Sequence, residues 1–124
     1  MVLVDTSVWI RFLANRAPHA EELSRLLSFD DVAAHELVAG ELLVGDRGGR
    51  REFLAVYDQI HRASTVPHAE VIEFVRHRKL NGRGISWVDV HLLASALVSR
   101  VRLWTADSRL ETVAAELGVA HRRL

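Results

Sequence analysis

The stretch VLVDTSVWIRFL, residues 2–13, decides how the chain begins to fold. Its first three residues are apolar and predict a short buried strand, while the apolar run over 8–13 predicts a helix that starts almost at once. Asp5, Thr6 and Ser7 stand between the two, and each residue type can cap a helix by accepting a bond from a free N–H group. Either the three potential caps are redundant, or one of these side chains has another task.

Length and composition predict a single domain spanning residues 1–124. Hydrophobic residues make up 49% of the chain, which argues against disorder. Cysteine is absent, which excludes disulfides, thiolate metal ligands and a cysteine nucleophile. No segment approaches the roughly 20 apolar residues of a membrane span, and the N-terminus lacks the pattern of a signal peptide. These features predict a cytoplasmic protein without a membrane anchor.

The charge balance gives a mixed indication about nucleic acids. The formal net charge is zero, whereas indiscriminate nucleic-acid binding usually needs a basic excess. Lys79 is the one lysine among 16 lysine and arginine residues, and arginine binds phosphate in a bidentate fork. A biased genome composition explains this equally well. The candidate phosphate contacts are Arg47, Arg50, Arg51, Arg76, Arg78 and Arg83.

Short apolar segments alternate with helical patterns along the chain. The expected strands cover residues 2–4, 32–34, 65–66, 102–104 and 119–120. The expected helices cover residues 8–13, 21–27, 37–44, 53–60, 71–80, 87–99 and 109–117. This alternation predicts an α/β domain with a small parallel sheet. Ligands of such sheets bind outside the carboxyl ends of the strands.

Two aspartates follow predicted strands and are therefore expected at that edge of the sheet. Asp5 comes directly after the first strand, and Asp107 comes shortly after the strand over 102–104. Either residue could be a cap or a turn residue. The spacing of Ser108 and Glu111 fits a capping box, so Ser108 is a second candidate for the cap, and if it caps the last helix, Asp107 is free.

Two further carboxylates lie on predicted helices. Glu41 falls on or beside the apolar stripe of its helix, where a buried carboxylate needs a partner or a metal; the alternative is that it reaches outward to solvent. Gly40 beside it would let a backbone or ligand approach. Asp89 has capping-box spacing from Ser86, so capping alone explains it.

The four carboxylates together favour a metal site. Clustered carboxylates raise one another's pKa, and a divalent cation relieves that repulsion. Ligands that offer only oxygen select hard ions such as Mg²⁺ or Mn²⁺. His35 and His91 lie close by in sequence, but their spacing shows no HExxH-like zinc pattern.

Four segments, VLVDTSVWI, ELVAGELLVGD, GISWVDVHLLASAL and LWTADSRLE, resemble in order the motifs of PIN-domain ribonucleases, in particular the VapC toxins of bacterial toxin–antitoxin pairs. The resemblance implies a three-layer α/β/α domain with a small, mainly parallel central sheet flanked by helices. It also implies a Mg²⁺-dependent endoribonuclease. Its catalytic and metal-binding residues would be Asp5, Glu41, Asp89 and Asp107, supported by Thr6, Ser7 and Thr105.

The same resemblance implies how the protein works and what it binds. Asp5, Asp89 and Asp107 would hold the metal, and Glu41 would orient or deprotonate the attacking water. The expected partners are an RNA substrate and a VapB-type antitoxin that occupies the active-site groove. A homodimer is expected, forming a heterotetramer or larger assembly with the antitoxin. The aromatic residues Trp9, Phe12 and Trp87 could form a partner surface, but we expect each to be core.

Two other functions stay open from the sequence. One is an aspartyl phosphotransferase or phosphatase with Asp5 as nucleophile, although haloacid dehalogenase-type phosphatases carry a second aspartate where this chain has Ser7. The other is a binding module without catalysis, whose acidic pocket grips an arginine of a partner. Metal-dependent cleavage of RNA would distinguish the nuclease from both.

Overall fold

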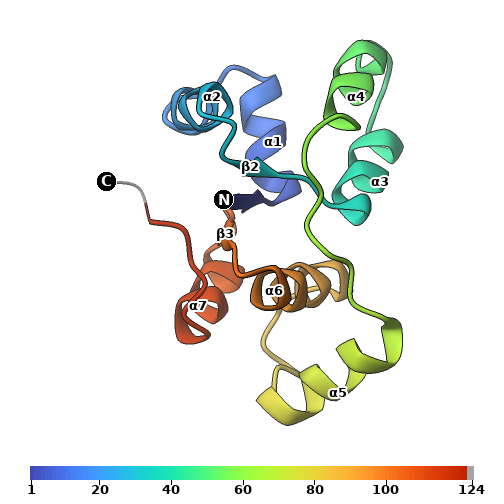
Figure 1. Cartoon of the computed structure of the whole chain (residues 1–124), viewed down its shortest axis with the longest axis vertical. Helices are drawn as coiled ribbons and strands as arrows, with labels where there is room; N and C mark the ends of the chain where they lie inside the picture. The colour runs from blue at the N-terminus through green and yellow to red at the C-terminus, as the bar shows by residue number, and fades with distance from the viewer. Residues whose placement is uncertain (123–124) are drawn as a thin grey trace.

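The computed structural model describes residues 1–122 and has a small parallel sheet at its centre (Figure 1). The strands are β1 (Val2–Val4), β2 (Val32–Ala33) and β3 (Arg102–Trp104), in the order β2-β1-β3. Both neighbours run parallel to β1, with Leu3 opposite Ala33 on one side and Leu103 on the other. The central strand is thus the apolar stretch with which the chain begins.

Seven helices surround the sheet within the described residues. They are α1 (Thr6–Leu13), α2 (His19–Ser28), α3 (Glu36–Val44), α4 (Arg51–Tyr57), α5 (His68–Arg78), α6 (Trp87–Ser99) and α7 (Ser108–Glu116). Helices α1 and α2 lie on one side of the strands, and α6 and α7 lie on the other (Figure 1). The predicted three-layer α/β fold is confirmed. Most helices begin earlier than predicted, because polar first-turn residues carry no apolar signal.

Two of the predicted strands are wrong. Residues 65–66 and 119–120 are not strands; the backbone instead makes single parallel bridges between Ala34 and Arg62 and between Leu103 and Ala120. The N–H of Ala63 donates to the carbonyl of Ala34 at 2.9 Å. The first bridge therefore lies a few residues before the predicted strand over 65–66. Val66 is buried through its side chain alone, which an apolar pattern cannot distinguish from pairing.

Aromatic packing fixes α1 against α4. Trp9 is 1% exposed, and its ring lies 5.7 Å from Phe12, 5.5 Å from Phe53 and 5.4 Å from Tyr57, measured between centroids. Trp9 is therefore core as predicted, and Phe12 packs against that core from a half-buried position. Trp87 is 42% exposed, so the expectation that it is core was wrong. It stands in the first turn of α6, at the edge of the packed layers.

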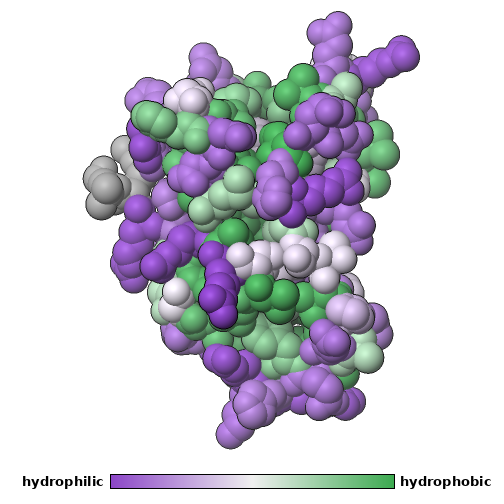
Figure 2. All heavy atoms as spheres, viewed as in Figure 1, coloured by the Kyte–Doolittle hydropathy of each residue, from purple (hydrophilic) through white to green (hydrophobic). Residues whose placement is uncertain are grey.

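Helix α5 packs on α6, on the side away from the strands (Figure 1). Figure 2 shows hydrophilic residues over much of the visible face, with hydrophobic residues exposed between them where α5 and α6 lie. None of the helices in residues 1–122 has the length and apolar character needed to cross a membrane.

Candidate functional site

Asp5 holds the helix-start position of α1 without capping it. Its backbone is extended, and its side chain makes no cap hydrogen bond. Its N–H donates to the carbonyl of Trp104 at 2.8 Å, which fixes it to the end of β3. The buried carboxylate accepts two hydroxyl bonds at Oδ2, from Ser7 Oγ at 2.7 Å and from Thr105 Oγ1 at 2.8 Å. The Oδ1 atom takes part in neither of these bonds.

The two supporting hydroxyls also hold the ends of two strands together. Ser7 Oγ accepts from the N–H of Ala106 at 3.0 Å, and Thr105 Oγ1 accepts from the N–H of Asp107 at 3.0 Å. Each hydroxyl thus donates to Asp5 and accepts from the backbone beyond β3. This arrangement fixes the Asp5 carboxylate more firmly than one bond would, because both donors are themselves held by the backbone.

Of the two candidates for the cap of α7, the structure shows Asp107 and not Ser108 in that position. The Asp107 backbone is extended, and its Oδ1 accepts from the N–H groups of Arg109 at 2.8 Å and Leu110 at 3.2 Å. Ser108 is already the first helical residue. Only Oδ1 is used in these bonds, so an exposed carboxylate caps the helix and still offers Oδ2 at the end of β3.

Asp89 forms the predicted capping box with Ser86 at the start of α6. Its N–H donates to Ser86 Oγ at 3.1 Å, and its Oδ2 accepts from the N–H of Ser86 at 2.8 Å. Burial raises the pKa of the Asp89 carboxyl, and the charges of Asp5 and Asp107 raise it further, although the bonds from Ser86 act in the opposite direction. This mutual influence places Asp89 electrostatically with the two strand-end aspartates.

Glu41 is exposed, so it does not lie buried in the apolar stripe of α3. Its Oε1 accepts from Thr6 Oγ1 at 2.6 Å, which brings α3 to the start of α1. No protein atom lies within 4 Å of a Cβ built on Gly40, so no backbone approaches there. Glu41 thus reaches the site through the residue next to Asp5, from the solvent side.

The carboxylate oxygens of Asp5, Glu41, Asp89 and Asp107 are the type of ligand that a hard divalent cation prefers. Mg²⁺ is such a cation and usually retains several waters beside its carboxylate ligands. Within residues 1–122, no three such groups are already close enough together to surround an ion. The four acidic residues therefore form a loose group whose like charges a cation would neutralise, rather than a closed protein cage.

Two arginines beside the site were not among the predicted phosphate contacts. A cavity of about 390 Å³ lies next to Ser7 and Asp107, and Arg11 and Arg109 line it. Arg11 Nη1 donates to the carbonyl of Ser7 at 2.9 Å. Arg109 packs over Gly84, where an added Cβ would lie 2.9 Å from its side chain. Arg11 follows Ser7 by four positions, and Arg109 follows Asp107 by two. This closeness in sequence to the site residues could have identified both arginines.

Several predicted arginines already have partners. Arg50 donates to the carbonyl of Leu42 at 3.0 Å, and Arg83 pairs with Glu116 at 2.9 Å. Arg76 pairs with Glu73 at 3.3 Å on the surface of α5. The exposed arginines of the set are Arg47, Arg51, Arg76 and Arg78.

His35 has a structural role. It is buried, its Nδ1 accepts from the N–H of Leu37 at 3.1 Å, and its Nε2 lies 2.9 Å from Ser95 Oγ. It caps α3 and ties it to α6, which leaves neither ring nitrogen for a metal.

The chain belongs to the PIN domain family, whose profile matches residues 2–116. It is 46% identical over 121 residues to Ribonuclease VapC32 from Mycobacterium tuberculosis strain H37Rv, covering 97% of this chain and 95% of the relative. The protein of that name from strain CDC 1551 matches equally.

A solved structure supports the fold. The crystal structure of PAE2754 from Pyrobaculum aerophilum superimposes with a TM-score of 0.57 at 16% identity, covering 94% of this chain and 88% of that one.

Proposed function

We propose that this protein is a metal-dependent endoribonuclease and the toxin of a toxin–antitoxin pair. The relatives named Ribonuclease VapC32 support the activity and the system. The observation that carries the proposal is the buried Asp5 carboxylate, which stands at a helix start without capping it and is held by two hydroxyls. A side chain fixed in this way serves a ligand better than it serves the helix.

Asp5, Asp89 and Asp107 would hold Mg²⁺, with Mn²⁺ as an alternative ion of similar preference. The bound ion would stabilise the negative charge that develops on the phosphate during cleavage. Ser7 and Thr105 orient Asp5 by donating to Oδ2, which would leave Oδ1 to bind the ion. These two hydroxyls are positioning residues.

Glu41 is suited to accept the proton of the attacking water, since its carboxylate is exposed and Thr6 fixes it beside the site. As the water oxygen forms its bond to phosphorus, the water proton passes to Glu41, and the bond to the departing ribose oxygen breaks. That oxygen takes a proton from solvent to become a hydroxyl. Arg11 and Arg109 are the nearest candidates to hold the RNA phosphates, because both line the cavity next to Asp107.

The Asp5→Asn variant tests this function. Asparagine keeps an oxygen that accepts from Ser7 and Thr105 but removes the charge, so we expect a folded protein that does not cleave RNA. Cleavage of a mixed RNA substrate would be measured with Mg²⁺, with Mn²⁺ and with EDTA. Wild-type cleavage by Asp5→Asn, or cleavage by the wild type in EDTA, contradicts the proposed site.

Exposed apolar residues are consistent with an antitoxin partner. Leu43 and Val44 on α3 are 62% and 87% exposed, and Val56 on α4 is 63% exposed. Burying apolar side chains of this size favours association. We propose that the partner is a VapB-type antitoxin bound to a toxin homodimer. Coexpression with the adjacent small gene, followed by mass measurement of the complex, tests this assembly.

A further inference from the structure

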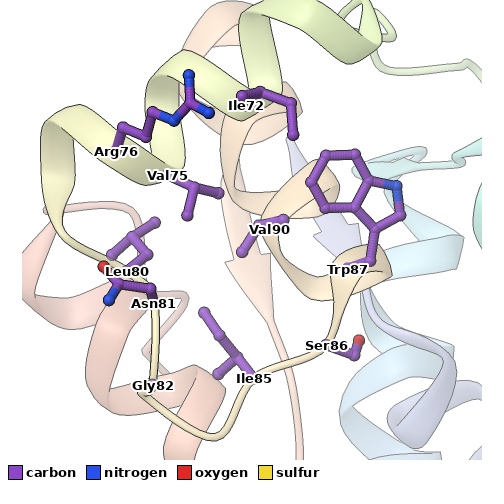
Figure 3. Close-up of a pocket in the computed structure, with 10 residues that line it drawn as sticks. All are labelled: Ile72, Val75, Arg76, Leu80, Asn81, Gly82, Ile85, Ser86, Trp87 and Val90. Carbon is purple, nitrogen blue, oxygen red and sulfur yellow. The ribbon is translucent and has the colours of Figure 1, made fainter.

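A second cavity, of about 410 Å³, lies between α5, the loop that follows it and the first turn of α6. Figure 3 shows Trp87 at one side of this cavity and Arg76 at the other, with apolar side chains between them. The apolar part includes Val75, Leu80 and Val90. The cavity is large enough for a planar aromatic group and offers it an apolar floor.

Trp87 is placed as a stacking surface. Its indole ring lies 5.1 Å from the His68 ring and 4.7 Å from the His91 ring, measured between centroids. The two imidazoles hold the indole in position, yet 42% of Trp87 is exposed. A large aromatic side chain that is both fixed and accessible is the surface on which nucleic-acid bases stack.

Arg76 lines the cavity and begins a basic segment at the end of α5. The last turn of α5 carries Arg76, His77 and Arg78, and Lys79 follows as the left-handed C-cap. Arg76 pairs with Glu73, but both side chains are 74% exposed, and such a surface pair contributes little. The concentration of cationic groups favours a polyanion over a basic peptide.

The cavity is linked to the acidic site through one residue, Ser86. Ser86 lines the cavity and at the same time forms the capping box with Asp89. Trp87 is the next residue along the chain. A strand whose scissile phosphate lies at the carboxylates can therefore place a neighbouring nucleotide in the cavity across one turn of helix.

We propose that the cavity between α5 and α6 binds an unpaired base of the RNA substrate, stacked on Trp87, with neighbouring phosphates at Arg76 and Arg78. This inference rests on the proposed function. The base must be unpaired, because a base inside a duplex cannot reach the indole face.

Binding in EDTA tests the inference separately from catalysis. The probe is an octauridylate, compared with an eight-unit abasic ribose-phosphate strand and with an RNA duplex. Trp9 and Trp104 are buried, so quenching of tryptophan emission by the octauridylate reports mainly on Trp87 in the wild type. The Trp87 variants lack this signal, so fluorescence anisotropy of an end-labelled octauridylate measures the affinity of every protein. We expect Trp87→Ala to weaken octauridylate binding by about 5-fold to 150-fold, Trp87→Phe to retain most of it, and abasic-strand binding to change little.

Phe29→Ala is the matched control, since Phe29 is 72% exposed and lies at the C-cap of α2. Far-UV circular dichroism and urea unfolding show whether each variant is folded. If Trp87→Ala is not folded, Trp87→Leu carries the test, because leucine is apolar but offers no stacking face. Unchanged octauridylate affinity in a folded Trp87→Ala variant overturns the base site. So does quenching by an antitoxin peptide but not by RNA. Neither result affects the proposed nuclease, which is tested separately by cleavage of RNA with metal and in EDTA.

Discussion

The hydroxyl of Thr105 donates to the carboxylate of Asp5 at 2.8 Å across 100 positions of the chain. The bond joins the end of β3 to the end of β1, and the same hydroxyl accepts from the N–H of Asp107. One buried oxygen therefore links two of the proposed metal ligands. The bond both joins the ends of β1 and β3 and orients Asp5. We therefore expect changes at Thr105 to affect stability and RNA cleavage together.

Thr105→Val separates the hydroxyl from the shape of the side chain. The change removes one donor and one acceptor from a buried position, and we expect a loss of about 1–3 kcal/mol in the free energy of unfolding. RNA cleavage should fall because Asp5 is less well oriented. Urea denaturation and a cleavage assay measure the two effects. Thr105→Ser keeps the hydroxyl, and its failure to restore cleavage would contradict the role assigned here.

Asp107 combines capping with its proposed metal role, and two substitutions distinguish them. Asparagine caps a helix about as well as aspartate, so Asp107→Asn should keep nearly all stability while lowering Mg²⁺-dependent cleavage. Asp107→Ala should also lose about 1 kcal/mol from the missing cap. Thermal or urea unfolding gives the stability, and cleavage across a Mg²⁺ series gives the activity. Full cleavage by Asp107→Asn at low Mg²⁺ would show that its charge is not needed.

The parts of the fold set by local signals could be predicted. Helix α6 and strand β3 have the predicted bounds. In α6 a capping box marks the start of a long apolar run, which leaves few alternatives for the first residue of the helix. The parallel sheet followed from short apolar segments separated by helices. Asp5 and Asp107 could be placed at one edge because the carboxyl ends of parallel strands meet there, whereas Glu41 and Asp89 lie on helices and joined the group through the resemblance.

Other features depend on choices that a sequence pattern does not resolve. Asp107 and Ser108 are adjacent and both can cap, and only the extended backbone of Asp107 decides between them. Glu41 lies beside an apolar stripe, but its orientation depends on where Thr6 comes to lie. Trp87 has the apolar character of a core residue in the sequence, but in the structure it lies partly exposed at the cavity beside α5. Each is decided by contacts between distant segments.

Stability should fall as the pH is lowered below about 6.5, and His35 is one cause. Burial lowers the pKa of His35 from 6.5, and its Nδ1 must stay unprotonated to accept from Leu37. Below pH 6.5 the unfolded chain therefore binds a proton that the folded chain does not, so the free energy of unfolding decreases until the folded pKa is passed. One proton contributes at most about 1.4 kcal/mol per pH unit.

Urea unfolding between pH 5 and 7.5 measures this slope in the wild type and in His35→Asn. Asparagine still caps the helix but cannot take up the proton, so the slope should decrease. The slope should not vanish in His35→Asn, because burial also lowers the pKa of His91 and of His121. The exposed His77→Asn is the control and should match the wild type. An unchanged slope in His35→Asn would rule out its contribution.

Arg109 should contribute one phosphate contact to RNA binding. Its guanidinium lines the cavity beside Asp107 and packs over Gly84, so it is held near the expected path of the strand. Each phosphate contact releases counterions, so Arg109→Gln should flatten the slope of log affinity against log salt by about one. Octauridylate binding in EDTA at several salt concentrations measures it. Arg100→Gln is the matched control, because Arg100 is exposed at the C-cap of α6, the end opposite Asp89. Equal slopes for the two variants would place Arg109 outside the RNA path.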